Sequence, residues 1–154
     1  METKFSGIFI DAWSTVLESF TSKSIMRVDV RPPQEAQETR DILVFMGIVG
    51  DIDAQIAMTM DAETGKNIAS EMLGGIEITE VNDYVISAVG ELCNMIMGNA
   101  CSSISMTNTN VDITPPTVIA DQSPPESLRK PTYNICILLE DLETIDFNVA
   151  MMTA

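Results

Sequence analysis

The 154-residue sequence predicts a single α+β domain in which one helix–strand–hairpin unit occurs twice. Two long stretches place apolar residues at helical spacing, and each is followed by short segments rich in β-branched residues. Each helical stretch also precedes a Val-Asp-(Val/Ile)-x-Pro-Pro sequence, at 28–33 and, 83 residues later, at 111–116. We therefore expect one mostly antiparallel sheet with the two long helices packed on one face.

The first unit is predicted to begin with a helix at 5–22, where aromatic and aliphatic residues recur on one helical face. Alternating side chains at 25–30 predict a strand. The Pro-Pro pair that follows ends this strand, because proline has no N–H to donate to a sheet. Residues 34–40 are polar, which is typical of a connecting loop.

The same unit closes with a hairpin, predicted at 41–60, where β-branched residues dominate and a Gly-Asp pair interrupts the run. Asp61 can cap the next helix, which is expected at about 62–73. A Gly-Gly pair at 74–75 is a typical helix stop. This short helix connects the two units.

The second unit is predicted to begin with the longest helix, at about 82–106, whose apolar stripe is wide enough to face a core. Three prolines predict a loop at 121–131. Short strands are expected at 110–113, 117–120, 133–139 and 144–152. The chain is thus predicted to be one domain, 1–154, with pseudo-repeats at about 5–60 and 82–152 and a connecting helix at about 61–75.

Acidic residues dominate the charge, with 23 Asp and Glu against 8 Lys and Arg and a formal net charge of −15. Nucleic-acid binding requires clustered basic residues, so we expect no nucleic-acid partner. The charge also disfavours anionic membrane surfaces, and no apolar run approaches the roughly 20 residues that span a bilayer. A partner with a positive patch or an exposed lysine is the natural expectation.

The residue types that are missing narrow the chemistry. Without histidine, the chain has no Ser-His or Cys-His nucleophilic pair, no histidine base and no histidine-ligated zinc. Its three cysteines form no Cys-x-x-Cys pair, and we expect reduced, buried thiols in a cytoplasmic protein. The N terminus is not expected to be a signal peptide. Any catalysis must therefore use carboxylates, amides and hydroxyls.

One face of the long helix combines polar residues with glycine. At about 100° per residue, Ser87, Glu91, Asn94 and Gly98 fall within about 60° of one another, opposite the apolar stripe. Gly90 also lies inside the helix, although a helical glycine costs about 1 kcal/mol relative to alanine. Such glycines indicate that another group comes close to the backbone. The face is a candidate partner-binding site, and the alternative is a solvated helix face with tolerated glycines.

The two units differ at this face. The same shift of 83 residues places Ile8 and Asp11 opposite Glu91 and Asn94, so the first unit lacks the acid–amide pair. If this helix face were only a solvated surface, the identity of its residues would have no functional meaning in either unit. The second unit is therefore the one expected to carry the function.

The spacing Ser87-x3-Glu91-x2-Asn94, followed after 21 intervening residues by Pro116, resembles the signature of the CheC/CheX/FliY phosphatases of bacterial chemotaxis. One such motif in a short duplicated chain resembles CheX in particular. The resemblance implies the CheC-like fold and a homodimer. It also implies an enzyme that hydrolyses the aspartyl-phosphate of a response-regulator receiver domain such as CheY.

The resemblance further implies a role for each matching residue. Asn94 would position the attacking water in line with the aspartyl-phosphate bond, and Glu91 would engage the lysine beside the phosphoryl group of the receiver domain. Partner-binding or supporting roles would fall to Ser87, Gly90, Gly98 and Pro116.

No metal or cofactor is expected on this chain, because the Mg²⁺ of receiver-domain chemistry would be held by acidic residues of the partner. The alternative function is a catalytically silent binding module, or a module related to the flagellar switch, with the same fold. Such a module would hold a receiver domain without hydrolysing its phosphoryl group. No sequence feature supports a third interpretation, in which the chain is an acidic domain that binds small molecules.

Overall fold

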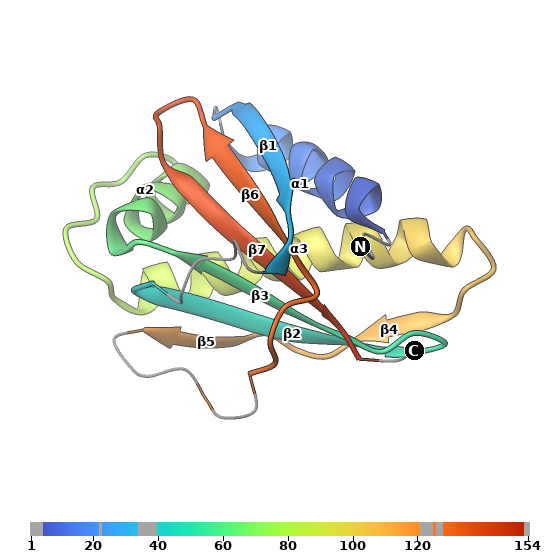
Figure 1. Ribbon diagram of the computed structural model, residues 1–154. Helices are drawn as coiled ribbons and strands as arrows, with labels where there is room; N and C mark the ends of the chain where they lie inside the picture. Colours follow the sequence, from blue (N-terminus) through green and yellow to red (C-terminus); the bar gives the residue numbers. More distant parts are fainter. Residues whose placement is uncertain (1–4, 22, 34–39, 121–124, 126–127, 153–154) are drawn as a thin grey trace.

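The computed structural model describes residues 5–21, 23–33, 40–120, 125 and 128–152 (Figure 1). The predicted loops at 34–40 and 121–131 lie largely outside these residues. The described helices are α1 (Ser6–Phe20), α2 (Ala62–Met72) and α3 (Asp83–Ser105). The described strands are β1 (Ile25–Arg31), β2 (Ile42–Gly50), β3 (Ala54–Met60), β4 (Val111–Ile113), β5 (Thr117–Ala120), β6 (Tyr133–Leu139) and β7 (Thr144–Met151).

In the described part of the chain, the strands form one sheet in the order β1-β6-β7-β3-β2-β4, and β5 also pairs with β2. Every pair is antiparallel. The order is symmetrical between the units: β1 pairs with β6, β4 pairs with β2, and the last strands, β3 and β7, pair in the middle. The α+β class with a duplicated unit is confirmed. The boundaries of the repeats along the chain stay a prediction.

The helices cover one face of the sheet. In Figure 1 the sheet lies in front of the helices. A cluster of aromatic rings joins α1 to the sheet: the ring centroid of Phe147 lies 5.4 Å from that of Phe9 and 5.8 Å from that of Trp13. The apolar stripe predicted for α3 is fully buried in the same core. Its members are Val85, Val89, Leu92, Ile96 and Ala100.

The first turns of α2 and α3 differ in how they are capped. Asp61 precedes α2, but its side chain makes no capping hydrogen bond, so the predicted capping role is wrong. Asp41 lies nearby because β2 pairs with β3, and its carboxylate accepts from the backbone N–H of Ala62 at 2.8 Å. At α3, the side chain of Asn82 accepts from the backbone N–H groups of residues 84 and 85. An Asn cap of this kind satisfies donors that have no partner within the helix.

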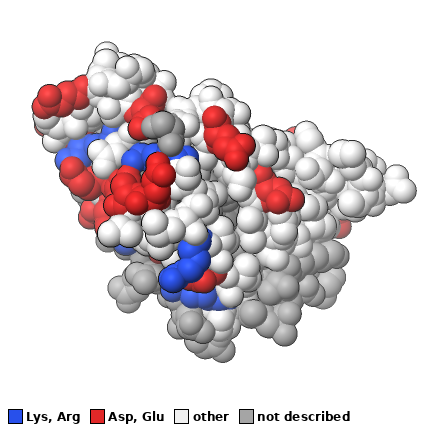
Figure 2. Space-filling view, turned by 90° about the horizontal axis from the view of Figure 1, so that it is seen from above, with Lys and Arg blue, Asp and Glu red and all other residues white. Residues whose placement is uncertain are grey.

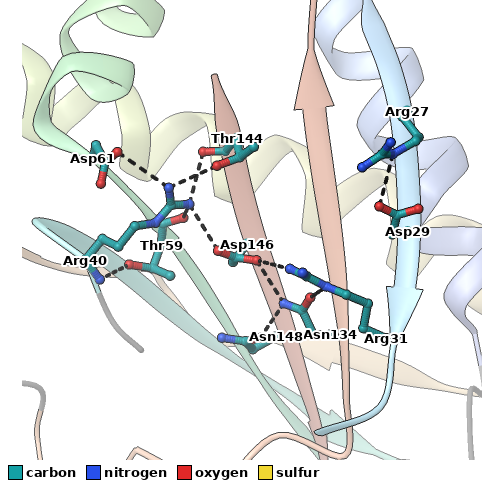
Figure 3. A network of polar contacts seen from close by, with 10 residues as sticks. All are labelled: Arg27, Asp29, Arg31, Arg40, Thr59, Asp61, Asn134, Thr144, Asp146 and Asn148. Atoms are coloured by element: carbon teal, nitrogen blue, oxygen red, sulfur yellow. Dashed lines mark hydrogen bonds and ion pairs between the residues drawn. The ribbon is translucent and has the colours of Figure 1, made fainter. Parts of the chain in front are cut away.

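The face of the sheet away from the helices holds a network of buried polar groups (Figure 3). Asp146, whose side chain is 2% exposed, lies at its centre, 3.0 Å from Arg31 and 3.1 Å from Arg40. Arg31 also donates to Asn134, and Arg40 donates to the backbone carbonyls of Thr59 and Thr144. Both oxygens of the buried carboxylate are thus paired, which offsets the cost of removing its charge from water.

Candidate functional site

The second unit presents a row of residues along the outer side of α3. Tyr84, Ser87, Glu91, Asn94 and Gly98 follow one another at spacings of three, four, three and four residues, so they lie along one side of the helix. We call this row the α3 seam. Ser87 and Glu91 are exposed, whereas Asn94 and Gly98 are half-buried. The structure therefore brings Ser87, Glu91, Asn94 and Gly98 together as predicted.

The polar groups of the seam are free to meet a partner. Among the described residues, the side chains of Ser87, Glu91 and Asn94 make no hydrogen bond or ion pair with any other part of the chain. Glu91 and Asn94 are three residues apart on a helix, so their Cβ atoms are roughly 5–6 Å apart. One bound group can touch both the carboxylate and the amide.

The two glycines of α3 have different surroundings. A Cβ built on Gly98 would have no atom within 4 Å apart from its own turns of the helix, so this part of the helix backbone is open to an approaching group. A Cβ built on Gly90 would lie 3.1 Å from Cγ2 of Val118, and Gly90 is buried. Gly98 thus faces open space, and Gly90 allows α3 to pack closely on β5.

Pro116 lies where two short strands meet. β4 ends at Ile113 and β5 begins at Thr117, and both strands pair with β2. Between them, the hydroxyl of Thr114 accepts from the backbone N–H of Gly47 at 2.7 Å. Proline has no N–H to donate to a sheet, so Pro116 is compatible with the break between β4 and β5. It lies two residues before Val118, whose side chain is next to Gly90 of α3.

A groove continues from the seam toward α2. Its volume is about 320 Å³, and it is lined by Met72, Leu73, Tyr84, Ser87, Ala88 and Glu91. Tyr84, Met72 at the end of α2 and Leu73 directly after it were not predicted as site residues from the sequence. The position of Tyr84, three residues before Ser87, was a usable signal, whereas the contribution of α2 depends on how the two helices pack.

The segment of the chain that carries the seam is acidic. Residues 67–128 contain eight Asp and Glu and no Lys or Arg, although they make up less than half of the chain. Figure 2 shows that the basic side chains of the upper face lie away from the C-terminal end of α3, which is uncharged. A cationic group on a partner is therefore attracted to this side of the molecule.

The described residues offer few other reactive groups. No three His, Cys, Asp or Glu side chains in the described ranges lie close enough to hold a metal ion. Burial raises the pKa of the Cys93 thiol to about 12 and also raises the pKa values of Cys101 and Cys136. A thiol with a raised pKa is a poor nucleophile because little thiolate is present at neutral pH. Within the same ranges, no helix combines the length and apolar character needed to cross a membrane.

Comparison with known proteins agrees with the fold and the motif. Residues 42–140 match the family model described as chemotaxis phosphatase CheX. A curated relative, the CheY-P phosphatase CheX of Thermotoga maritima, is 34% identical over 79 residues, which make up 51% of this chain and 51% of the relative. The matched segment thus spans about half the length of that relative.

Solved structures match over nearly the whole chain. CheX from Desulfovibrio desulfuricans has a TM-score of 0.80 at 20% identity, covering 97% of this chain and 99% of that one. A CheX-CheY-BeF3-Mg complex from Borrelia burgdorferi has a TM-score of 0.82 at 23% identity, covering 99% and 100%. A CheC-like superfamily protein from Shewanella sp. PV-4 has a TM-score of 0.80 at 19% identity, covering 99% and 100%.

The architecture is therefore that of the CheC-like chemotaxis proteins. The family model covers more than half of the sequence, and so the chain belongs to the chemotaxis phosphatase CheX family. The resemblance carried by the motif of the second unit is confirmed at the level of the family. The individual roles of Glu91 and Asn94 stay a prediction.

Proposed function

We propose that this protein is a phosphatase that hydrolyses the aspartyl-phosphate of a CheY-like receiver domain. The observation that carries the proposal is the free acid–amide pair, Glu91 and Asn94, on the exposed seam of a chain that belongs to the CheX family. The relative from Thermotoga maritima is itself named as a CheY-P phosphatase. An acyl phosphate is already reactive, so positioning and charge stabilisation supply most of the acceleration.

Asn94 orients the attacking water in this mechanism. Its amide can accept from the water and donate to a neighbouring oxygen, and it keeps this capacity at every pH because it does not titrate. Its half-buried position on α3 holds the side chain on a rigid element. The absence of histidine from the chain agrees with a mechanism that needs no general base of its own.

Glu91 engages the lysine that lies beside the phosphoryl group of the receiver domain. The carboxylate is exposed and has no ion-pair partner among the described residues, so nothing in this part of the chain competes for it. A carboxylate–ammonium contact fixes the register of two docking proteins. Ser87, one turn earlier, orients Glu91 once the partner is bound.

The remaining motif residues shape the surface. Gly98 leaves the helix backbone open, so that loops of the receiver domain can approach Asn94 closely. Gly90 and Pro116 support the site from the side of α3 that packs on the sheet. Gly90 lets α3 lie against β5, and Pro116 lies between β4 and β5. The Mg²⁺ of the reaction is held by acidic residues of the receiver domain, with no metal on this chain.

We also propose that the protein forms a homodimer through β1. Among the described strands, β1 pairs only with β6, so its other edge is open. Two β1 strands that pair antiparallel about Val28 place Arg27 opposite Asp29 of the second copy. They also place exposed Met26, at 57%, opposite exposed Val30, at 38%. Sedimentation should show that Arg27→Asp weakens the dimer and that the double change Arg27→Asp/Asp29→Arg restores it.

The decisive experiment follows phosphate release from a CheY-type receiver domain phosphorylated with a small-molecule phosphodonor. Wild-type protein should accelerate release, and Asn94→Ala should lower the acceleration about 100-fold. Asn99→Ala is the matched control, because it removes an amide from the same helix outside the seam. If wild type binds the receiver domain without accelerating release, the silent binding module is the correct function.

A further inference from the structure

Large apolar side chains are exposed at the end of the seam nearest to α2. Tyr84 is 61% exposed and Leu73 is 42% exposed, and both line the groove of about 320 Å³. Ile76, three residues after Leu73, is 47% exposed, and its backbone carbonyl accepts from the hydroxyl of Ser70 at 2.5 Å. Clustered exposed apolar residues of this kind are typical of a binding surface.

The groove is continuous with the proposed catalytic face. Ser87 and Glu91 belong both to the seam and to the lining of the groove, and Tyr84 lies two turns before Glu91 on the same side of α3. A protein that places a cation against the Glu91 carboxylate therefore also covers the groove. The part of the partner that enters the groove lies next to that cation.

The lining decides what kind of side chain fits. Met72, Leu73, Ala88 and the ring of Tyr84 present carbon and sulfur, which favour an apolar group over a charged one. The one charged residue in this lining is the acidic Glu91, so a partner that is neutral or cationic around this group is favoured. A second copy of this chain on the same face would bring acidic surfaces together.

From these observations we propose that the groove between α2 and α3 receives an apolar side chain of the receiver domain, adjacent to the lysine that Glu91 engages. This inference rests on the proposed function and adds a second anchor to it. The lysine alone gives a point contact, whereas an apolar anchor one or two turns away fixes the direction in which the receiver domain lies on α3. Tyr84 and Leu73 are then specificity-determining residues that do not touch the phosphoryl group.

Binding to a receiver domain loaded with beryllofluoride in place of the phosphoryl group tests the inference without turnover. Tyr84→Ala should weaken binding about tenfold, as expected for an aromatic anchor at an interface. Tyr84→Phe should bind nearly as wild type, because the ring remains. Met106→Ala is the matched control: Met106 is 86% exposed and lies roughly 33 Å along the axis of the same helix.

A double-mutant cycle identifies the occupant. The apolar residue beside the active-site lysine of the receiver domain is changed to Ser, and the loss of affinity is measured against wild type and against Tyr84→Ala. We expect the change to weaken binding to wild type and to have little further effect on the Tyr84→Ala variant. Additive losses, or a Kd for Tyr84→Ala within twofold of wild type, would overturn the proposal.

Failure of the two proposals can be told apart. If wild type binds the receiver domain but does not accelerate phosphate release, the phosphatase function fails and the Kd comparison still decides the groove. Release that is accelerated with no effect of Tyr84→Ala on Kd rejects the groove alone. No binding of the loaded receiver domain by wild type rejects both.

Discussion

Gly90 faces Val118 so closely that a Cβ at residue 90 would lie 3.1 Å from Cγ2 of Val118. Gly98, eight residues later on the same helix, has no atom within 4 Å of the equivalent position apart from its own turns of the helix. The helix thus contains a matched pair of glycines, one with a neighbour that limits a larger side chain and one without.

The pair gives a first prediction about stability. Gly98→Ala should raise the free energy of unfolding by up to about 1 kcal/mol, because alanine is the better helix former and has room for its methyl group. Gly90→Ala should gain less, since the methyl group presses on Val118 and offsets the gain. Urea denaturation of the two variants measures the difference. An equal gain in the free energy of unfolding at both positions would show that Val118 of β5 moves away from the added methyl group without measurable cost.

The same substitution has a functional consequence. If loops of the receiver domain approach the backbone at Gly98, a methyl group there should raise the KM for the phosphorylated receiver domain although the fold is more stable. Steady-state kinetics on Gly98→Ala test this directly. A more stable variant with unchanged KM would show that the partner does not approach the helix at this point.

The fold was predictable from the sequence because its signals are local. Helical spacing at 5–22 and 82–106, strand alternation and the Pro-Pro pairs each report on a few neighbouring residues. The seam was predictable for the same reason, since residues three or four apart on a helix share a face whatever surrounds them.

The parts that could not be predicted depend on contacts between distant segments. The Asp61 cap was wrong because Asp41, brought close by the pairing of β2 with β3, supplies the acceptor instead. The surroundings of Gly90 depend on where β5 lies, and the groove depends on how α2 meets α3. Neither is encoded in local spacing.

A second prediction concerns the charge of Glu91. Glu91→Gln should raise the KM for the phosphorylated receiver domain about tenfold, because the lysine of the partner loses a charge-assisted contact. Asp112→Asn is the control, since it changes the net charge equally at the exposed middle residue of β4. Equal effects of the two variants would mean that overall charge, and not a specific contact, governs binding.

Ionic strength gives a third prediction for the same surface. Added salt should raise the KM of the wild-type protein, because it screens attraction between the acidic segment 67–128 and a cationic partner. Stopped-flow association rates at low and high salt would measure this attraction. Rates that do not change with salt would contradict a cationic partner surface.

A fourth prediction concerns the network on the other face of the sheet. Asp146→Ala should destabilise the protein by about 3 kcal/mol, because Arg31 and Arg40 lose the carboxylate that pairs with both of them. Glu63→Ala is the control: its ion pair with Lys66 leaves the carboxylate 73% exposed, so the loss should be below about 1 kcal/mol. Chemical denaturation compares the two, and equal losses would show that burial adds nothing to the Asp146 pairs.

The last prediction uses the buried thiol of Cys93. Burial raises the pKa of Cys93 to about 12 from an ordinary value of 9.0, so the folded state holds this proton more tightly than the unfolded state. The resulting stabilisation is fully present below pH 9 and is lost as the pH rises toward 12. The free energy of unfolding of Cys93→Ala should therefore fall less steeply than that of wild type over this range.

Thiol labelling provides an independent measurement of the same burial. At pH 8, Cys93 should react with a disulfide reagent only when the protein unfolds, whereas the half-buried Cys101 and Cys136 should react slowly in the folded state. Unfolded protein, in which all three thiols react, sets the end point. Cys93 labelling that is faster than unfolding would show that the core around α3 opens locally, and the rigid support proposed for Asn94 would then be lost.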